Sequence, residues 1–178
     1  MSWERTVRLH ELARGPVRLD LEPDEAQRAE IAKRLKLQGL PSLTARVTVK
    51  PWLDGAEITG RIDAVVEQIC GVSLDPFEAE LSGDIDLRVV PAGSPHASSS
   101  EGSELELDPD APDAPDILDG DTIDVTAYVI EHLALEIDPF PRKPGAIFEY
   151  EGPKEETSPF AALKALTDPK TRPPEEPS

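Results

Sequence analysis

Apolar and polar residues alternate along three successive stretches in the middle of the chain, and this pattern constrains the fold more than any other feature. Strict alternation has the period of a β-strand with one buried face. The stretches cover residues 43–50, 56–70 and 77–89. Asp54-Gly55, between the first two, is a hairpin signal, and residues 71–76 favour a second turn. We therefore expect a three-stranded antiparallel meander at the centre of the protein.

Two of these strands contain an irregularity. In residues 56–70, Val65 and Ile69 fall out of phase with the apolar positions, which indicates a bulge or a strand covered on both faces. In residues 77–89, a glycine at position 83 predicts a kink.

The N-terminal part predicts two further strands and a helix. Residues 4–9 and 16–21 alternate, so we expect them to extend the sheet. The helix is expected over residues 24–37, because Pro23 suits a first turn and Asp24 favours the positive end of the helix dipole. We expect Gly39 to end it. Its polar face is basic and carries Arg28, Lys33, Arg34 and Lys36.

A second helix is predicted over residues 125–138. Asp124 is a good N-cap, Val129 and Leu133 lie on one helical face, and Pro139 ends the pattern. The expected fold is α+β: an antiparallel meander, extended by N-terminal strands into a curved sheet or open barrel, packed with two helices.

An acidic loop interrupts this fold. From Glu101 to Asp124 the chain has ten acidic residues and no basic one. Such composition cannot bury apolar surface, so we expect residues 91–118 to be a disordered loop. We expect one domain, residues 1–150, with this loop inside it, followed by a polar, proline-rich tail over residues 151–178. Residues 159–167 are the one stretch of the tail that fits a short amphipathic helix.

Charge limits the class of partner. The chain has a net charge of −18. Its first fifty residues hold ten Lys/Arg and seven Asp/Glu, whereas the remainder holds eight and twenty-nine. This balance argues against DNA and against broad electrostatic binding to nucleic acid. It fits a basic protein partner better. Without an apolar N-terminal segment or a membrane-length run, we expect a cytoplasmic protein without membrane contact, and a monomer.

No catalytic set stands out, so we expect no enzyme, no cofactor and no metal. The three histidines, His10, His96 and His132, are scattered and have no metal-ligand spacing with the single cysteine. Cys70 has no basic neighbour in sequence that would lower its pKa, so a buried structural thiol is expected.

The order of these elements resembles the YceD family, the large ribosomal RNA subunit accumulation proteins. The resemblance rests on residues 65–70, Val-Val-Glu-Gln-Ile-Cys, with the following turn, the long return strand and the acidic loop. It continues through Ile123-Asp124, the helix and the proline-rich residues 139–148, and it covers roughly residues 1–150. Pro141-Arg142-Lys143-Pro144-Gly145-Ala146 is similar to the alphaproteobacterial form.

This resemblance implies a non-enzymatic bacterial factor that supports accumulation of 23S rRNA and biogenesis of the large ribosomal subunit. Many members carry Cys-x-x-Cys and a later Cys. Here Ser73 stands at the second position and the late segment has no Cys, so no metal site is implied. The implied partners are ribosome assembly components, either a large-subunit protein or the 23S rRNA precursor. The residues that we expect to bind a partner are Arg28, Lys33, Arg34, Lys36, Arg142, Lys143, Pro144 and Gly145.

Two alternatives remain open. These cations could simply solubilise an acidic protein. The chain could also be an acidic protein-interaction adaptor or a chaperone-like factor, whose acidic loop shields a basic client.

Overall fold

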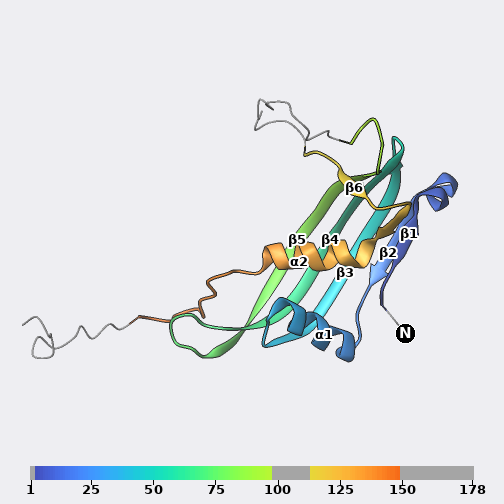
Figure 1. Ribbon diagram of the computed structural model, residues 1–178. Coiled ribbons are helices and arrows are strands. Elements are labelled where there is room, and N and C mark those ends of the chain that lie inside the picture. Colours follow the sequence, from blue (N-terminus) through green and yellow to red (C-terminus); the bar gives the residue numbers. More distant parts are fainter. Residues whose placement is uncertain (1–2, 98–112, 149–178) are drawn as a thin grey trace, which may run out of the picture. The chain divides into compact units, whose positions relative to one another are not determined.

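The computed structural model describes residues 3–97 and 113–148. Figure 1 shows its elements in chain order. The N-terminal elements are β1 (Thr6–Arg8), the 3₁₀ helix η1 (Leu9–Arg14), β2 (Val17–Leu21) and α1 (Glu25–Leu35). The long strands are β3 (Gly39–Trp52), β4 (Gly55–Ile69) and β5 (Pro76–Pro91). The last elements are β6 (Asp116–Leu118), β7 (Thr122–Asp124) and α2 (Val125–Glu136). All of them belong to the first of two units of the chain, residues 1–146 and 147–178.

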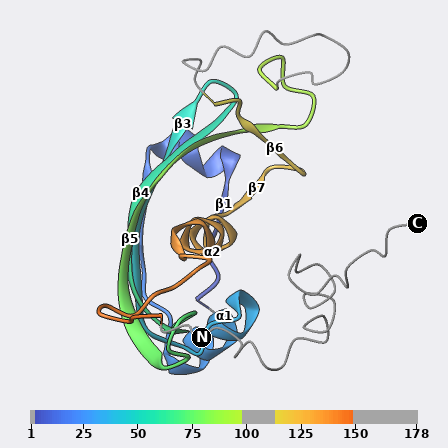
Figure 2. The same ribbon diagram turned by 90° about the vertical axis from the view of Figure 1, so that its left-hand side faces the viewer.

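The larger sheet has the strand order β2-β3-β4-β5-β6. Its neighbouring strands are antiparallel, except that β6 runs parallel to β5. A second sheet pairs β1 with β7 and so brings the N-terminal residues beside the start of α2. Figure 2 shows the larger sheet curving around α2, which lies against its concave face. The predicted α+β fold, with a meander extended into a curved sheet, is confirmed. Only β2 of the two N-terminal strands extends that sheet; β1 pairs with β7 instead, so the expectation that residues 4–9 join it is wrong.

The core fills the space between the concave face and α2. The four residues of β3 that the alternation predicts to point inward are at most 2% exposed. On α2, Val129 and Leu133 are fully buried, as the helical spacing predicts. Burying a side chain of this size stabilises the fold by roughly 1.5–3 kcal/mol. The largest fully buried side chains of the sheet are Leu43, Ile58, Ile62 and Ile85.

Helix α1 begins where the sequence predicts and ends earlier. Oδ1 of Asp24 accepts the N–H of Gln27 at 2.9 Å, and Oε1 of Gln27 accepts the N–H of Asp24 at 2.8 Å, which is a capping box. The last helical residue is Leu35, and Lys36 follows in the left-handed conformation with φ of 58°. Gly39 is already the first residue of β3, so the prediction that it ends the helix is wrong.

The β3–β4 hairpin turns at Leu53-Asp54, one residue earlier than predicted. Trp52 pairs with Gly55, and Leu53 takes the positive φ of 51°. Gly55 is needed for a different reason. A Cβ at this position would collide with the backbone carbonyl of Val89, because β5 passes directly against it.

Gly83 likewise leaves space for a neighbouring side chain, and it does not interrupt β5. The β4–β5 pairing is continuous through it, from Ile69 opposite Pro76 to Ala56 opposite Val89. A Cβ at Gly83 would lie 2.6 Å from Oε1 of Glu136, in the last turn of α2.

The irregularity that the sequence predicts for residues 56–70 lies on the partner strand. The β3–β4 register shifts between Gly39 and Ser42, in β3, while β4 keeps its phase. The side chains of Val65 and Ile69 lie on the outer face of β4, and the residues that precede them in sequence are buried on the inner face. The prediction of a bulge in β4 itself is therefore wrong.

Part of the predicted acidic loop is ordered. Residues 116–118 form β6, so the prediction of disorder is wrong for them. Leu118 is 6% exposed in the core, and its carbonyl accepts the N–H of Ala92 at 3.2 Å. An apolar side chain within the acidic stretch thus anchors the chain to the end of β5. Residues 98–112, the predicted tail and its expected short helix over residues 159–167 lie outside the described residues.

Candidate functional site

The predicted basic face of α1 separates into one structural arginine and three exposed cations. Arg28 donates from Nε to the carbonyl of Leu40 at 3.1 Å and from Nη1 to the carbonyl of Pro23 at 2.9 Å. Its guanidinium therefore ties α1 to the segments on either side of it and is only partly accessible to a partner. The exposed cations are Lys33, Arg34 and Lys36.

The second predicted group lies on residues 138–146, which follow α2 and dock against the turn between β4 and β5. The Gln68 side chain donates from Nε2 to the carbonyl of Asp138 at 3.2 Å. The N–H of Gly71 donates to the carbonyl of Pro141 at 2.8 Å. These bonds fix a segment without regular secondary structure onto the end of a strand pair.

Pro144 and Gly145 shape a turn within this segment. The N–H of Ala146 donates to the carbonyl of Lys143 at 3.0 Å, and Gly145 has a φ of 80°. Proline at the second position and a positive-φ glycine at the third are typical of a type II turn. The turn leaves Arg142 exposed and places Nζ of Lys143 3.5 Å from Oδ2 of Asp75.

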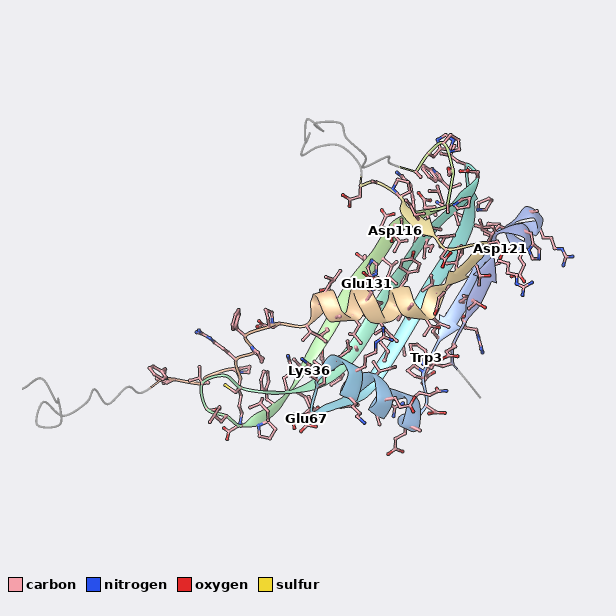
Figure 3. All side chains as sticks on the ribbon, viewed as in Figure 1. Trp3, Lys36, Glu67, Asp116, Asp121 and Glu131 are labelled. Carbon is pink, nitrogen blue, oxygen red and sulfur yellow. The ribbon has the colours of Figure 1, made fainter. Side chains whose placement is uncertain are left out.

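The two basic groups flank one end of the sheet, which we call the hairpin end: residues 67–76, where β4 turns into β5. On one side, the N–H of Gln38, just after α1, donates to the carbonyl of Glu67 at 2.9 Å. On the other side, Gln68 holds Asp138. Figure 3 shows Lys36 and Glu67 at this end. The fold thus brings the end of α1 and residues 138–146 to the same end of the sheet, although the sequence separates them by about a hundred residues. Arg34 points elsewhere, because it lines a pocket with Trp3 and with Asp124 at the start of α2.

Cys70 lies at the hairpin end, fully buried, as expected. Its sulfur accepts backbone N–H groups from Val72 at 3.4 Å, Ser73 at 3.4 Å and Lys143 at 3.3 Å. The Ser73 side chain and these N–H groups lower the pKa of the Cys70 thiol from 9.0 to about 6. The sequence shows no basic neighbour that would lower this pKa, and the structure lowers it with hydrogen-bond donors instead: Val72 and Ser73 in the turn that follows Cys70, and the distant Lys143.

Within residues 3–97 and 113–148, no group of three or more His, Cys, Asp or Glu residues could hold a metal ion. The histidines lie apart, with His10 in η1, His96 after β5 and His132 in α2. No helix in the described parts of the chain is long and apolar enough to cross a membrane.

A second surface, on the outer face of β5, was missed from the sequence. Its exposed alternate residues are acidic from Glu78 to Asp86, apart from Ser82. Glu78 lies directly opposite Glu67 of β4, and Asp84 lies opposite Arg61. We define the β5 acidic row as Glu78, Glu80, Asp84 and Asp86. The polar half of the same alternation that predicts the strand would have revealed it.

A groove of about 490 Å³ lies beside this row, between β5, β6 and α2. Asp86, Asp116, Glu131 and the exposed Leu135 are among its lining residues, and Figure 3 shows Asp116 and Glu131 on this side. Burial, together with Asp116, raises the pKa of Tyr128 in the groove to about 12, so it stays a neutral phenol.

Arg88, the one basic residue that lines this groove apart from His132, is already engaged. Its guanidinium lies 3.4 Å from Oε1 of Glu57 and 5.1 Å from the ring centroid of Trp52, a cation–π contact. Glu57 also pairs with Lys50, whose hydrogen bond most strongly lowers the Glu57 pKa. The groove and the β5 acidic row therefore form a continuous acidic margin of the sheet.

Comparison with known proteins gives one match. The family model of the large ribosomal RNA subunit accumulation protein YceD matches residues 58–167. No curated protein and no solved structure matches the chain. Within the described residues, the match spans most of β4, all of β5 and α2, and residues 138–146, so it contains the hairpin end and Cys70. Because it covers more than half of the sequence, the chain belongs to the YceD family of large ribosomal RNA subunit accumulation proteins.

Proposed function

We propose that this protein is a non-enzymatic factor that supports accumulation of 23S rRNA and biogenesis of the large ribosomal subunit. The family match over residues 58–167 carries this proposal. The family description names a role in accumulating an RNA and names no reaction.

The proposed contact surface is the set of exposed cations near the end of α1 and in the turn after α2: Lys33, Arg34, Lys36, Arg142 and Lys143. Arg28, Pro144 and Gly145 act as its supports, through the carbonyl bonds and the type II turn described above. The chain has a net charge of −18 and few exposed cations, so its electrostatic attraction for RNA is weak. Contact with the assembling subunit therefore passes mainly through a protein component. Direct contact with RNA would weaken steeply with salt.

A complementation experiment tests the role. In a host strain that lacks the gene, the wild-type chain is expected to restore the ratio of 23S to 16S rRNA. A variant with Lys33, Arg34, Lys36, Arg142 and Lys143 changed to Gln is expected to fold and to fail. The matched control changes Arg14, Arg18, Arg46, Arg61 and Lys50, which lie elsewhere, to Gln.

Each result has a defined meaning. If the wild-type chain leaves the 23S level unchanged, the proposed function is wrong. If the control variant fails as completely as the site variant, the loss comes from net charge, and the contact surface is misplaced.

A further inference from the structure

Strand β5 has a long open edge. It pairs with β4 from Pro76 to Val89, but with β6 only at Val89–Pro91. Along residues 76–88, no other strand among the described residues covers its second side. Alternate N–H and C=O groups of an edge strand point outward and can pair with an added strand. Figures 1 and 2 show β5 at this margin, with β6 only at one end.

The usual structural protections of a sheet edge are weak here. The fourteen β4–β5 pairs run without a register shift, so no bulge turns the strand away. Prolines stand only at the two ends, Pro76 and Pro91, and leave the residues between them able to donate. The distinguishing feature of this edge is the β5 acidic row on its outer face.

The charge of the β5 acidic row is poorly balanced by the fold. Asp84 lies 3.4 Å from Arg61. Glu78, Glu80 and Asp86 have no ion pair within the part of the chain that the structure describes. Glu78 faces Glu67 directly across the strands, and like charges in this position are destabilising. A cation placed beside the row would therefore be attracted by several carboxylates at once.

The other face of the same edge offers apolar surface. Ala79, Leu81 and Leu87 are only partly buried against the core. The groove beside them exposes Leu135, which is 76% exposed on α2. A strand added to β5 would place alternate side chains on this face and the remaining ones beside the acidic row.

We propose that the open edge of β5 binds an extended, basic segment of a partner protein by strand addition. The segment would form main-chain hydrogen bonds along residues 76–88. Lys or Arg at every second residue would face Glu78, Glu80, Asp84 and Asp86, and small apolar residues between them would face Leu81 and the groove. This inference stands on the geometry of β5 and goes beyond the proposed function, since binding to a peptide does not depend on rRNA accumulation.

Electrostatic repulsion also disfavours two other possible occupants of this edge, a second copy of this chain and RNA. Two copies of this chain paired through β5 would place the acidic rows against each other, which opposes a dimer at this edge. An RNA backbone would meet the same carboxylates with its phosphates and be repelled.

The test uses the purified full chain and a labelled peptide of alternating Lys and Val, long enough to span Glu78 to Asp86. Binding is followed by fluorescence anisotropy, and hydrogen exchange locates the protected amides. We expect protection of residues 76–88. An otherwise identical peptide, N-methylated at alternate backbone amides, is expected to bind at least about tenfold more weakly, because it cannot complete the ladder.

Charge variants complete the experiment. Replacing Glu78 and Glu80 by Gln and Asp86 by Asn should weaken binding roughly tenfold, since exposed pairs contribute modestly and add. The matched control replaces Glu22, Glu25 and Glu30 by Gln and should bind like the wild type. Undetectable binding, protection outside β5, equal binding of the methylated peptide, or a dimer formed through β5 would each overturn the proposal.

Discussion

The backbone N–H of Lys143 donates to the sulfur of Cys70 at 3.3 Å, across 73 residues of sequence. This bond joins residues 138–146 to the turn after β4, and it completes a set of donors that Val72 and Ser73 begin. An N–H set of this kind stabilises a thiolate, because hydrogen bonds to the charged form lower its pKa. Cys70 is thus a point of contact between the turn after β4 and residues 138–146, both of which lie within the matched residues 58–167.

The first prediction concerns the pH dependence of stability. The pKa of Cys70 is about 6 in the folded chain, below its usual 9.0. A lowered pKa stabilises the folded state once the thiol is deprotonated, so the contribution is absent below about pH 6, grows with pH and is complete above about pH 9. Urea unfolding should therefore show the stability difference between wild type and Cys70→Ser growing over this interval.

Ser73→Ala supplies the control for this prediction. The Ser73 hydroxyl is the largest cause of the lowered pKa, so its removal should move the thiolate titration, followed by ultraviolet absorbance, toward higher pH. Stability curves of wild type and Cys70→Ser that stay parallel throughout would contradict the assigned environment.

The second prediction compares two glycines that are crowded by different neighbours. A Cβ at Gly55 meets the backbone of Val89, which cannot move without breaking the β4–β5 ladder. A Cβ at Gly83 meets Cγ, Cδ and Oε1 of the exposed Glu136 side chain, which can rotate away. Gly55→Ala should cost about 1–3 kcal/mol or more, as overpacking does, and Gly83→Ala less than about 1 kcal/mol.

Thermal and urea unfolding of the two variants measure this difference. Because the substitution is the same and both sites lie in strands, each variant is the other's control. Equal losses of stability would show that the crowding at Gly55 is relieved by a movement of β5.

Sequence reasoning found what local periodicity determines. The alternation in residues 43–50 identified every inward side chain of that stretch, and the cap at Asp124 was placed correctly, since its Oδ1 accepts the N–H of Ala127 at 3.0 Å. These features depend on neighbours within one turn or one strand. The β5 acidic row is also a local feature, and the alternation in residues 77–89 was sufficient to predict it.

Features that depend on distant partners could not be read in this way. Arg28 and Lys33 look equivalent on one helical face, and only the carbonyls of Pro23 and Leu40 separate them. The need for glycine at position 55 comes from a strand more than thirty residues later. Likewise, the donors around Cys70 come in part from a segment beyond α2.

The third prediction tests whether Arg28 stabilises the fold of α1 while the exposed Lys33 does not. Arg28→Gln removes charged hydrogen bonds to two partly buried carbonyls and should destabilise the fold by about 1.5–3 kcal/mol. Lys33→Gln changes an exposed side chain and should stay within about 0.5 kcal/mol. Urea unfolding measures both, and similar values for the two variants would contradict a structural role for Arg28.

The last prediction concerns the like-charged pair at the open edge. Glu78 lies opposite Glu67, so Glu78→Gln should stabilise the free protein by about 0.2–1 kcal/mol at low salt. Screening shortens the reach of exposed charges, so the gain should shrink as ionic strength rises. Glu80→Gln is the matched control, because Glu80 faces the uncharged Val65 and its removal relieves no direct opposition. Urea unfolding at low and high salt measures both variants. A loss of stability in Glu78→Gln, or an equal gain in Glu80→Gln, would show that repulsion between Glu67 and Glu78 does not strain this edge. A selective, salt-sensitive gain would show that the carboxylates of Glu67 and Glu78 repel each other in the free protein, which is the charge arrangement that the proposed basic segment would neutralise.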